Sequence, residues 1–340
     1  MNQLWTRRQT LWMLTGVAGS LVLHACTPGN QTTENTTTAI GLNPWIGSTP
    51  LYIAQEKGFF QQRGLNLDVK IFSGTSDANS AFMAGRLDSW TPVTSEAVAS
   101  VTQGSQFRIV LVQDTSVGAD GILARNSIES LADFKGKEIA VEEDSVSHFF
   151  LLQVLESVGL GAEDFTLVNT PPDAAAAAYQ SGKIEIAVTY SPYLAKANEV
   201  QSDGRVIYDS AQMPSAIADL YVFSPQIIEQ NPQSVDAFIR GVLEGLEFLQ
   251  NNREEGLAIA AREIGISPEE LAQDLQGIQL PDLAKNIEIL TNHQSQLSLL
   301  KSMESMAKFL KERNQITEIP DLAQLIEPKF IQAIKSDGVV

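Results

Sequence analysis

The chain of 340 residues has a single cysteine, Cys26, and only three histidines. One cysteine excludes an internal disulfide and a cysteine-based zinc cluster. The sequence also lacks the Gly-x-Ser-x-Gly of hydrolases, the His-Glu-x-x-His of metalloproteases and the Gly-x-x-x-x-Gly-Lys that cradles phosphates. We therefore predict a protein with no catalytic residue, no metal and no cofactor.

Basic side chains are scarce as well. The sequence has 23 Lys and Arg against 41 Asp and Glu, which gives a formal net charge of −18 at pH 7. Nucleic-acid binding needs a basic face that neutralises phosphates, so this imbalance argues against DNA or RNA as a partner. The length allows two lobes of ordinary domain size.

Long apolar runs are missing except at the start of the chain. Residues 1–25 are typical of an export signal peptide, because two arginines precede the stretch Leu11 to Leu23, which is too short to span a membrane. We favour ordinary Sec export, and Thr6-Arg7-Arg8 leaves twin-arginine export as the alternative. No later segment reaches transmembrane length.

The end of this signal predicts a lipid anchor. Leu23-His24-Ala25-Cys26 has the form of a lipobox, in which the cysteine sulfur carries the lipid. Residues 26–37 are polar and low in complexity, which is typical of a flexible tether. The sequence thus predicts a lipoprotein of the cell envelope, held through Cys26 on the periplasmic or extracytoplasmic face of the membrane.

From about Ile40 to Ser224 the sequence alternates strand-like and helix-like segments. Nearly continuous apolar runs such as Phe107 to Val112 are typical of buried parallel sheets. The predicted strands cover 38–42, 67–72, 87–93, 107–112, 138–141, 165–168 and 184–188. The predicted helices cover about 78–83, 96–101, 146–158, 173–181 and 192–200. This alternation predicts an α/β fold of mostly parallel sheets flanked by helices.

Two short apolar runs, Gly121 to Ala124 and Ala218 to Phe223, are the expected crossings between two lobes. Lobe 1 would comprise 38–124 and 216–340, and lobe 2 would comprise 125–215. After Pro225 the pattern becomes helical, with apolar stripes that indicate packing against the first lobe. The predicted helices of this part are 232–251, 257–264 and 298–310.

The segment NPWIGSTPLYIAQEKGFF, residues 43–60, follows the first predicted strand and opens a helix that Thr49 is expected to cap. Followed by GLNLDV (64–69), it resembles the first strand–helix unit of solute-binding proteins of the nitrate/sulfonate/taurine type, which feed ABC importers. Further segments resemble the same family in order over about residues 39–310: FMAGRLD (82–88), GADGILA (118–124), SLADFKGK (130–137), SHFFLL (147–152) and GKIEIA (182–187).

The resemblance implies the two-lobe periplasmic binding protein fold of type II, with a small-molecule ligand in the cleft between the lobes. It also implies a monomer whose partners are an ABC permease and its ATPase. The segment TYSPY (189–193) stands where the family usually carries a Trp-acidic-Pro-Tyr phrase, so the usual ligand is not carried over. The residues are compatible with a guanidine-importing subgroup of this family.

Two other protein classes have to be weighed. Pyrimidine synthases of thiamine biosynthesis resemble this chain at the level of the sheet, but their cysteine-rich loop is absent here, so we expect a protein that is not an enzyme. An extracellular sensory protein that reuses the fold is the second alternative. Glu142-Glu143-Asp144 with His148 could suggest a metal site, although acids in a first helical turn are favoured by the helix dipole alone.

The charge of the loops expected at the cleft points to the ligand. The segments 43–49, 73–77, 91–96, 114–121, 142–148, 189–193 and 211–219 contain no Lys or Arg. They contain Asp77, Glu96, Asp114, Asp120, Glu142, Glu143, Asp144 and Asp219. Carboxylates with aromatic faces suit a small cation. We expect Asp77, Glu96 and Asp144 to be caps or turn residues, and Asp120 and Glu142 to contact the ligand.

The favoured ligand is therefore a small nitrogen-containing cation, above all guanidinium. The aromatic faces would come from Trp45, Trp90, Tyr190 and Tyr193. A small anion such as a sulfonate, taurine or nitrate remains the alternative, because helix N-termini bind anions without an arginine. Its hydroxyl partners would be Ser48, Thr49, Thr94, Ser95, Ser145 and Ser147. The predicted ligand-binding residues are Trp45, Ser48, Thr49, Trp90, Thr94, Asp120, Glu142, His148 and Tyr190.

Overall fold

The structure is a computed structural model that describes residues 36–213 and 217–338. The predicted signal peptide 1–25, the predicted lipidation site Cys26 and nearly all of the predicted tether 26–37 lie outside the described residues. The first strand, β1, already begins at Thr36, because backbone pairing with the next strand starts at that residue. The last two residues of the predicted tether therefore belong to a sheet.

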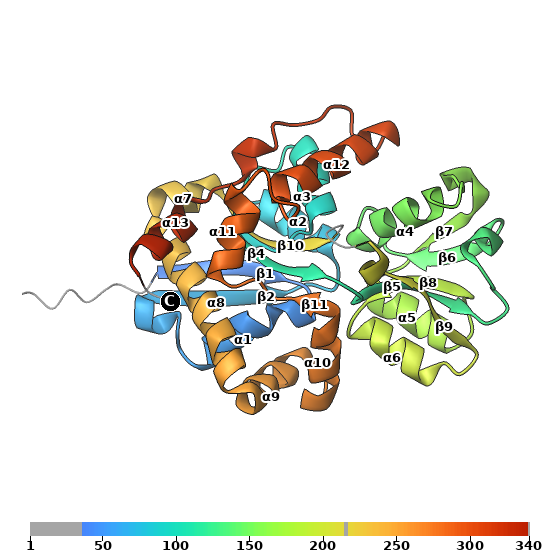
Figure 1. The fold of residues 1–340 in the computed structure, drawn as a ribbon, viewed down its shortest axis with the longest axis horizontal. Helices are drawn as coiled ribbons and strands as arrows, with labels where there is room; N and C mark the ends of the chain where they lie inside the picture. The colour runs from blue at the N-terminus through green and yellow to red at the C-terminus, as the bar shows by residue number, and fades with distance from the viewer. Residues whose placement is uncertain (1–35, 214–216, 339–340) are drawn as a thin grey trace, which may run out of the picture. The chain divides into compact units, whose positions relative to one another are not determined.

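The first sheet has six strands in the order β11-β4-β10-β3-β1-β2 (Figure 1). Their bounds are β1 Thr36–Leu42, β2 Leu65–Ile71, β3 Ser89–Trp90, β4 Arg108–Ser116, β10 Ala218–Phe223 and β11 Ile278–Gln279. Pairing of β1 with β2 and β3 is parallel, whereas β10 is antiparallel to both β3 and β4. Strands β1 to β4 therefore point the same way, and β10 and β11 run against them.

The second sheet has five strands in the order β7-β6-β8-β5-β9. Their bounds are β5 Asp120–Arg125, β6 Glu138–Val141, β7 Thr166–Asn169, β8 Ile186–Tyr190 and β9 Gly204–Asp209. Only β5 runs against the other four, since it pairs antiparallel with both β8 and β9. Both sheets thus have mostly one strand direction, as the sequence predicts.

Helices flank both sheets, and the C-terminal part is helical (Figure 1). Around the six-stranded sheet lie α1 Thr49–Glu56, α2 Thr75–Met83, α3 Thr94–Thr102, α7 Pro225–Gln230, α8 Pro232–Asn251, α9 Arg253–Ile264, α10 Pro268–Asp274, α11 Leu283–Thr291, α12 Leu299–Glu312 and α13 Lys329–Ser336. Around the five-stranded sheet lie α4 Val146–Glu156, α5 Pro172–Gln180 and α6 Tyr193–Val200. Among the described residues, no helix is long and apolar enough to cross a membrane.

The two apolar runs expected to be crossings are strands. Residues 121–124 lie inside β5, which pairs with β8 and β9, so the chain leaves the first sheet a few residues earlier, near Gly118. Gly118 has φ +129, a conformation that side-chain-bearing residues rarely adopt. An apolar run fits a buried strand and a crossing equally well, and the sequence did not separate the two.

Other predicted elements differ mainly in length. Strand β6 and helix α8 have the predicted bounds, whereas the strand predicted over 87–93 shrinks to β3, which stops before Pro92. Strand β9 was not predicted. All its residues are half-buried, so it lacks the alternation of buried and exposed side chains by which a sequence pattern reveals a strand. Thr49 does not cap α1: it is the first helical residue, and its hydroxyl donates to the carbonyl of Ile46, 2.7 Å away.

The core of the first sheet centres on an aromatic group that joins β10 to α8. Phe238 of α8 stacks on Phe60 with ring centroids 5.7 Å apart. Tyr221 and Phe223 of β10 meet the same ring edge-on at 5.0 and 5.2 Å. Offset and edge-on aromatic pairs contribute about 0.5–1.5 kcal/mol beyond the area they bury. This packing fixes β10, whose first residues reach the site described next.

Candidate ligand-binding site

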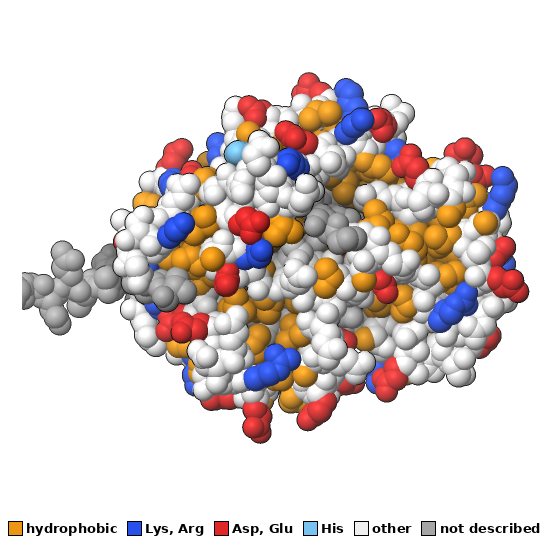
Figure 2. Space-filling view, in the orientation of Figure 1, with side chains coloured by type: hydrophobic (Ala, Val, Ile, Leu, Met, Phe, Trp, Pro, Cys, Tyr) orange, Lys and Arg blue, Asp and Glu red, His pale blue; other side chains and the backbone are white. Residues whose placement is uncertain are grey.

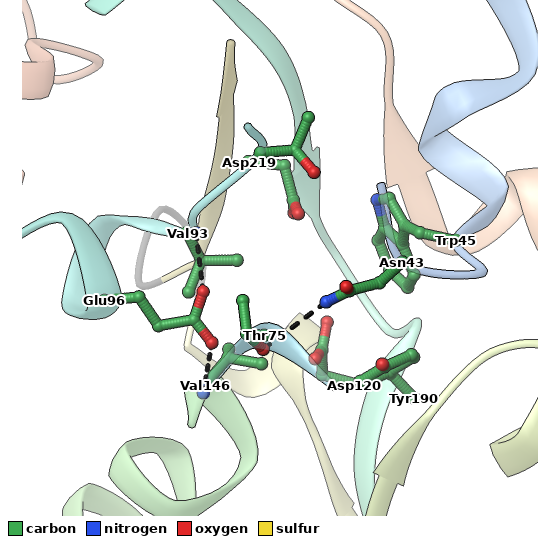
Figure 3. Close-up of a pocket in the computed structure, with 10 residues that line it drawn as sticks. Asn43, Trp45, Thr75, Val93, Glu96, Asp120, Val146, Tyr190 and Asp219 are labelled. Atoms are coloured by element: carbon green, nitrogen blue, oxygen red, sulfur yellow. Dashed lines mark hydrogen bonds between the residues drawn. The ribbon is translucent and has the colours of Figure 1, made fainter. Parts of the chain in front are cut away.

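A small cavity of about 30 Å³ lies where strand ends from both sheets meet. It is lined by Asn43, Trp45, Thr75, Thr91, Val93, Glu96, Asp120, Val146, Tyr190 and Asp219 (Figure 3). These residues follow β1 and β3, end β8, begin β5 and β10, or open the helices α2, α3 and α4. The carboxyl edge of parallel strands is where open α/β folds hold ligands. Among the residues that the structure describes, no Lys or Arg lines the cavity.

Trp45 is fixed in this cavity by a buried carboxylate. Its indole Nε1 donates to Oδ2 of Asp114, 2.8 Å away. Gly47 makes the contact sterically feasible, because a Cβ at that position would lie 1.8 Å from Oδ2 of Asp114 and 2.4 Å from Nε1 of Trp45. The Trp-x-Gly spacing in the segment NPWIGS is thus explained by the approach of Asp114 to the backbone.

Asp114 and Asp219 face each other across β4 and β10. Burial raises the pKa of Asp114 to about 7, and the neighbouring charge of Asp120 raises it further. Burial, then the charges of Asp114 and Asp120, raises the pKa of Asp219 well above its usual value. A carboxyl pair on neighbouring strands keeps a proton to higher pH than a single carboxyl group, because two like charges side by side are costly to ionise together.

Asp120 begins β5 opposite Tyr190 and is 3% exposed. Its Oδ2 has no hydrogen-bond partner among the described residues. Burial raises the pKa of Asp120 to about 6, and a hydrogen bond with Ser116 partly opposes that rise. A buried carboxylate oxygen without a partner costs free energy, so it marks a place where a donor is expected to bind.

Glu96 lies on the opposite side of the cavity at the start of α3. It is 5% exposed, and its two carboxylate oxygens accept hydrogen bonds from the backbone N–H groups of Val93 and Val146, each at 3.1 Å (Figure 3). Burial raises the pKa of Glu96 to about 7, although these two hydrogen bonds and one with Thr75 lower it.

Aromatic rings form one wall. Trp45 and Tyr190 meet edge to face, with centroids 5.6 Å apart and planes at 89°. Tyr193 packs on the far side of Tyr190 at 6.0 Å and does not line the cavity. The hydroxyl of Tyr190 has no partner among the described residues, and burial raises its pKa well above the usual value, so this hydroxyl stays a donor.

Of the predicted ligand-binding residues, Trp45, Asp120 and Tyr190 line the cavity. The hydroxyls of three others serve the protein itself. Ser48 accepts from Gln113 at 3.3 Å, Thr49 donates to Ile46, and Thr94 donates to the carbonyl of Ala218 at 3.3 Å. Trp90 is 1% exposed and packs on Phe82, with ring centroids 6.1 Å apart.

Glu142 and His148 also lie outside the cavity lining. Glu142 is half-buried against Gly74, where a Cβ would lie 2.3 Å from its Oε1. Burial, then the charges of Asp77 and Asp173, raises its pKa to about 7. The ring Nδ1 of His148 accepts the backbone N–H of Asp144 at 3.1 Å, which supports a residue with φ +59.

Seven lining residues were missing from the predicted set, and two of them, Val93 and Val146, are apolar. Asn43, Thr75, Thr91 and Asp219 sit in loops that the sequence had placed at the cleft, but their residue types alone gave no reason to prefer them. Glu96 was expected to be only a helix cap, and it does cap α3. What the sequence could not show is that its second oxygen reaches α4, fifty residues further along the chain.

A metal site at Glu142-Glu143-Asp144 and His148 was the weaker of the sequence hypotheses. Within 36–213 and 217–338, no group of three or more His, Cys, Asp or Glu side chains is placed to hold a metal ion. The Nδ1 of His148 is already occupied by the backbone of Asp144.

Two sheets whose strand ends meet at a buried acidic cavity define the class of two-lobe binding proteins of type II. The chain belongs to the family described as NMT1/THI5 like, which matches residues 45–256. It is 25% identical over 298 residues to the taurine-binding periplasmic protein of Escherichia coli K12, covering 83% of this chain and 89% of that protein.

Solved structures share the fold. The alkanesulfonate-binding protein SsuA from Xanthomonas axonopodis pv. citri, bound to MOPS, superposes with a TM-score of 0.71 at 17% identity, covering 87% of this chain and 99% of the other. The periplasmic nitrate-binding protein NrtA from Synechocystis PCC 6803 gives 0.71 at 16% identity, covering 90% and 89%. These similarities confirm the fold.

Proposed function

We propose that this chain is the extracytoplasmic solute-binding subunit of an ABC importer and that it captures a small nitrogen-containing cation, with guanidinium the favoured ligand. The observation that carries the proposal is the unpartnered Oδ2 of Asp120. It is buried in a cavity with two further carboxyl groups, Glu96 and Asp219, and no Lys or Arg within 36–213 and 217–338 lines that cavity. A cation with N–H donors supplies both the missing charge and the missing hydrogen bonds.

Guanidinium fits this site for chemical reasons. It is planar and permanently charged, and its N–H groups pair in parallel with carboxylate oxygens. The Trp45 and Tyr190 rings offer faces and edges for a flat cation. The small size of the cavity favours a ligand of few atoms. Asn43 adds an acceptor, since its Oδ1 has no partner among the described residues.

The alternative ligand is a small anion such as taurine, an aliphatic sulfonate or nitrate. The similar proteins named above favour it, because they are a taurine-binding, an alkanesulfonate-binding and a nitrate-binding protein. Against it, the hydroxyls of Thr49, Thr94 and Ser145 already donate to backbone carbonyls, that of Ser145 to Glu142 at 2.7 Å. The buried acids would also repel an anion.

Calorimetric titration of the purified protein at pH 8 with guanidinium chloride, taurine, sodium nitrate and a short alkanesulfonate tests the ligand. The proposal predicts binding of guanidinium and none of the others at comparable concentration. If the protein binds taurine, nitrate or the alkanesulfonate and does not bind guanidinium, the cation proposal is wrong and the anion alternative replaces it. The same preparation, run by sedimentation, tests the proposed monomer.

Transport and sensing predict different partners. An importer subunit docks on a permease that works with an ATPase, and both genes are expected beside that of this chain. An extracellular sensory protein, the alternative from another class, would have a receptor kinase as its neighbour instead. Affinity capture from membranes with the bound ligand should recover the permease if the transport role is right.

Anchoring through Cys26 is part of the proposal. The residue follows the apolar stretch of residues 11–23 and precedes a polar tether, so a lipid on its sulfur would hold the folded body at the extracytoplasmic face. Cys26→Ser should release the protein from membranes with its fold intact. A Cys26→Ser protein that stays in detergent-free membrane fractions would rule the anchor out.

We also propose that the two lobes, each built on one of the two sheets, close on the ligand. The chain passes between the sheets before β5 and before β10, and these short connections would absorb the rotation. Small-angle scattering should give a smaller radius of gyration with saturating guanidinium than without it. An unchanged scattering profile with ligand bound would mean that the two lobes do not close and that the protein is a rigid scaffold.

A further inference from the structure

Glu96 is bound to the N-termini of two helices at once. Its Oε2 accepts the N–H of Val93, the residue that precedes α3, and its Oε1 accepts the N–H of Val146, the first residue of α4. Val93 has no side-chain acceptor for the first-turn N–H groups of α3, and Glu96 makes the other half of a capping box by accepting the N–H of Val93 itself. Figure 3 shows both hydrogen bonds, with Glu96 reaching across from α3 toward α4.

These two helices belong to different sheets. Helix α3 packs on β10 of the six-stranded sheet, and α4 packs on β5 and β8 of the five-stranded sheet. Free N–H groups at a helix N-terminus carry a partial positive charge and bind anions well. In this chain the anion is already present, and it is a side chain that is 5% exposed.

We infer that Glu96 determines the charge selectivity of the cavity, because its carboxylate occupies the position at which the N-termini of α3 and α4 would otherwise hold an anionic ligand. This inference rests on the proposed function and deepens it. The occupied N-termini exclude anions, and the carboxylate adds negative charge to the cavity that Asp120 and Asp219 line. The same two hydrogen bonds join the sheets.

Two substitutions of Glu96 test the inference. Glu96→Ala frees both N–H groups, and Glu96→Gln keeps the shape of the side chain while removing its charge. Both variants should gain affinity for sodium nitrate and taurine relative to the parent, by about tenfold or more for Glu96→Ala and less for Glu96→Gln. Titrations are run at pH 8, above the raised pKa of Glu96 at about 7. Glu199→Ala, an exposed acid of α6, is the matched control and should gain no anion affinity.

The outcomes separate this inference from the proposed ligand. A gain in anion affinity by the Glu96 variants supports it, whether or not the parent binds guanidinium. A parent that binds guanidinium, with folded Glu96→Gln and Glu96→Ala proteins that bind nitrate and taurine no better than the parent, overturns the inference and leaves the ligand standing. Glu96→Gln decides the matter alone if Glu96→Ala does not fold. Tight nitrate or taurine binding by the parent overturns both.

Discussion

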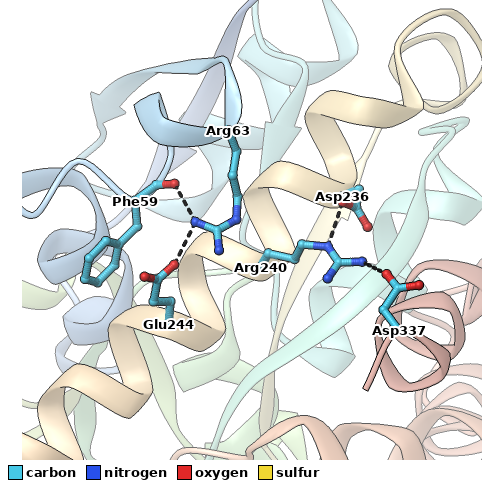
Figure 4. Close-up of polar contacts among 6 residues, drawn as sticks. All are labelled: Phe59, Arg63, Asp236, Arg240, Glu244 and Asp337. Carbon is cyan, nitrogen blue, oxygen red and sulfur yellow. Dashed lines mark hydrogen bonds and ion pairs between the residues drawn. The ribbon is translucent and has the colours of Figure 1, made fainter. Parts of the chain in front are cut away.

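Two acidic side chains of α8 have basic partners, whereas the acidic side chains that line the cavity have none among the described residues. Glu244 pairs with Arg63 at 2.7 Å, and Asp236 pairs with Arg240 at 2.8 Å, whose guanidinium also binds Asp337 (Figure 4). All three acids are partly exposed to solvent. Among the described residues, those that line the cavity beside the buried acids are aromatic, apolar or uncharged polar, and none is Lys or Arg.

The difference shows which carboxylates serve the fold. Partly exposed ion pairs contribute about 0–1 kcal/mol each, and the protein could lose any one of them. Buried carboxyl groups without a counter-ion cost stability unless they are protonated or paired. Acidic and basic side chains lie together around the surface that Figure 2 shows, so this protein has basic residues available and does not place them at the cavity. A site of this kind is expected where a ligand completes the charge.

The largest effect is expected from neutralising Asp120. Asp120→Asn keeps the side-chain shape and removes the charge of the carboxylate with the unpartnered oxygen. Loss of one partner from a buried charge pair typically costs about 2–5 kcal/mol, so guanidinium affinity should fall by at least about tenfold in calorimetry. Asp236→Asn, which neutralises an acid of α8, should leave that affinity unchanged.

The sign of the Asp120→Asn effect also separates the ligands. If the ligand is an anion, the substitution removes a repulsion, and the affinity for nitrate or a sulfonate should rise or stay level. Tighter anion binding by Asp120→Asn, with no guanidinium binding by the parent, would contradict the cation proposal.

A smaller effect is expected from crowding the contact that orients Trp45. The new Cβ of Gly47→Ala would lie 1.8 Å from Oδ2 of Asp114, so the carboxylate and the indole must separate. Overpacking of this kind typically costs about 1–3 kcal/mol, which chemical denaturation should measure. Gly74→Ala is the control, because its Cβ would meet only the end of the half-buried Glu142 side chain, which can move.

Ligand affinity should depend on pH through the buried acids of the cavity. With the pKa of Asp120 at about 6 and that of Glu96 at about 7, these two carboxyl groups hold protons at pH 5 and release them by pH 8. A cation prefers the ionised carboxylates, so guanidinium affinity should rise about tenfold from pH 5 to pH 8. Anion affinity would show the opposite slope.

The free energy of unfolding of the ligand-free protein should fall as the pH rises from about 4 to about 7. Carboxyl groups of the unfolded chain ionise near about pH 4. The raised pKa values of Asp120 and Glu96 mean that their contribution is fully present below that value and is lost as the pH rises through about 6 to 7. Urea unfolding at a series of pH values measures this loss, and saturating guanidinium should reduce it. A pH slope that guanidinium leaves unchanged would show that the ligand does not bind at these acids.

The smallest effect is expected at the pair of Glu244 and Arg63. Glu244→Gln should lower the free energy of unfolding by about 1 kcal/mol or less, since both side chains are partly solvated. Ligand affinity should not change. A loss of several kcal/mol would show that this ion pair is important for the fold. The contrast between the ion-paired acids of α8 and the cavity acids would then not separate structural from ligand-binding carboxylates.

Much of the fold could be predicted from the sequence, because strand and helix periodicities are local. Helix α8 begins at a proline and ends at an asparagine pair, and its apolar stripe is unbroken, so its bounds were right. The crossings were placed too late, since a buried strand such as β5 and an interlobe connection have the same apolar composition.

The site could be predicted only in part. Trp45, Asp120 and Tyr190 were found because aromatic and acidic residues stood at strand ends, and strand ends share one edge of a sheet. Glu96 was assigned only a capping role, because the sequence gives the capping pattern but not the approach of α4 to α3. The pairing of Asp114 with Asp219 depends on register between strands far apart in the chain, which no local pattern encodes.

A crystal structure of the protein with guanidinium tests the central claim most directly. The account predicts a flat ligand in the cavity between Trp45 and Tyr190, with its N–H groups within hydrogen-bonding distance of Asp120 and Asp219 and with Glu96 still bound to Val93 and Val146. Guanidinium found elsewhere, or an anion seated at the N-termini of α3 and α4 with Glu96 displaced, would contradict it.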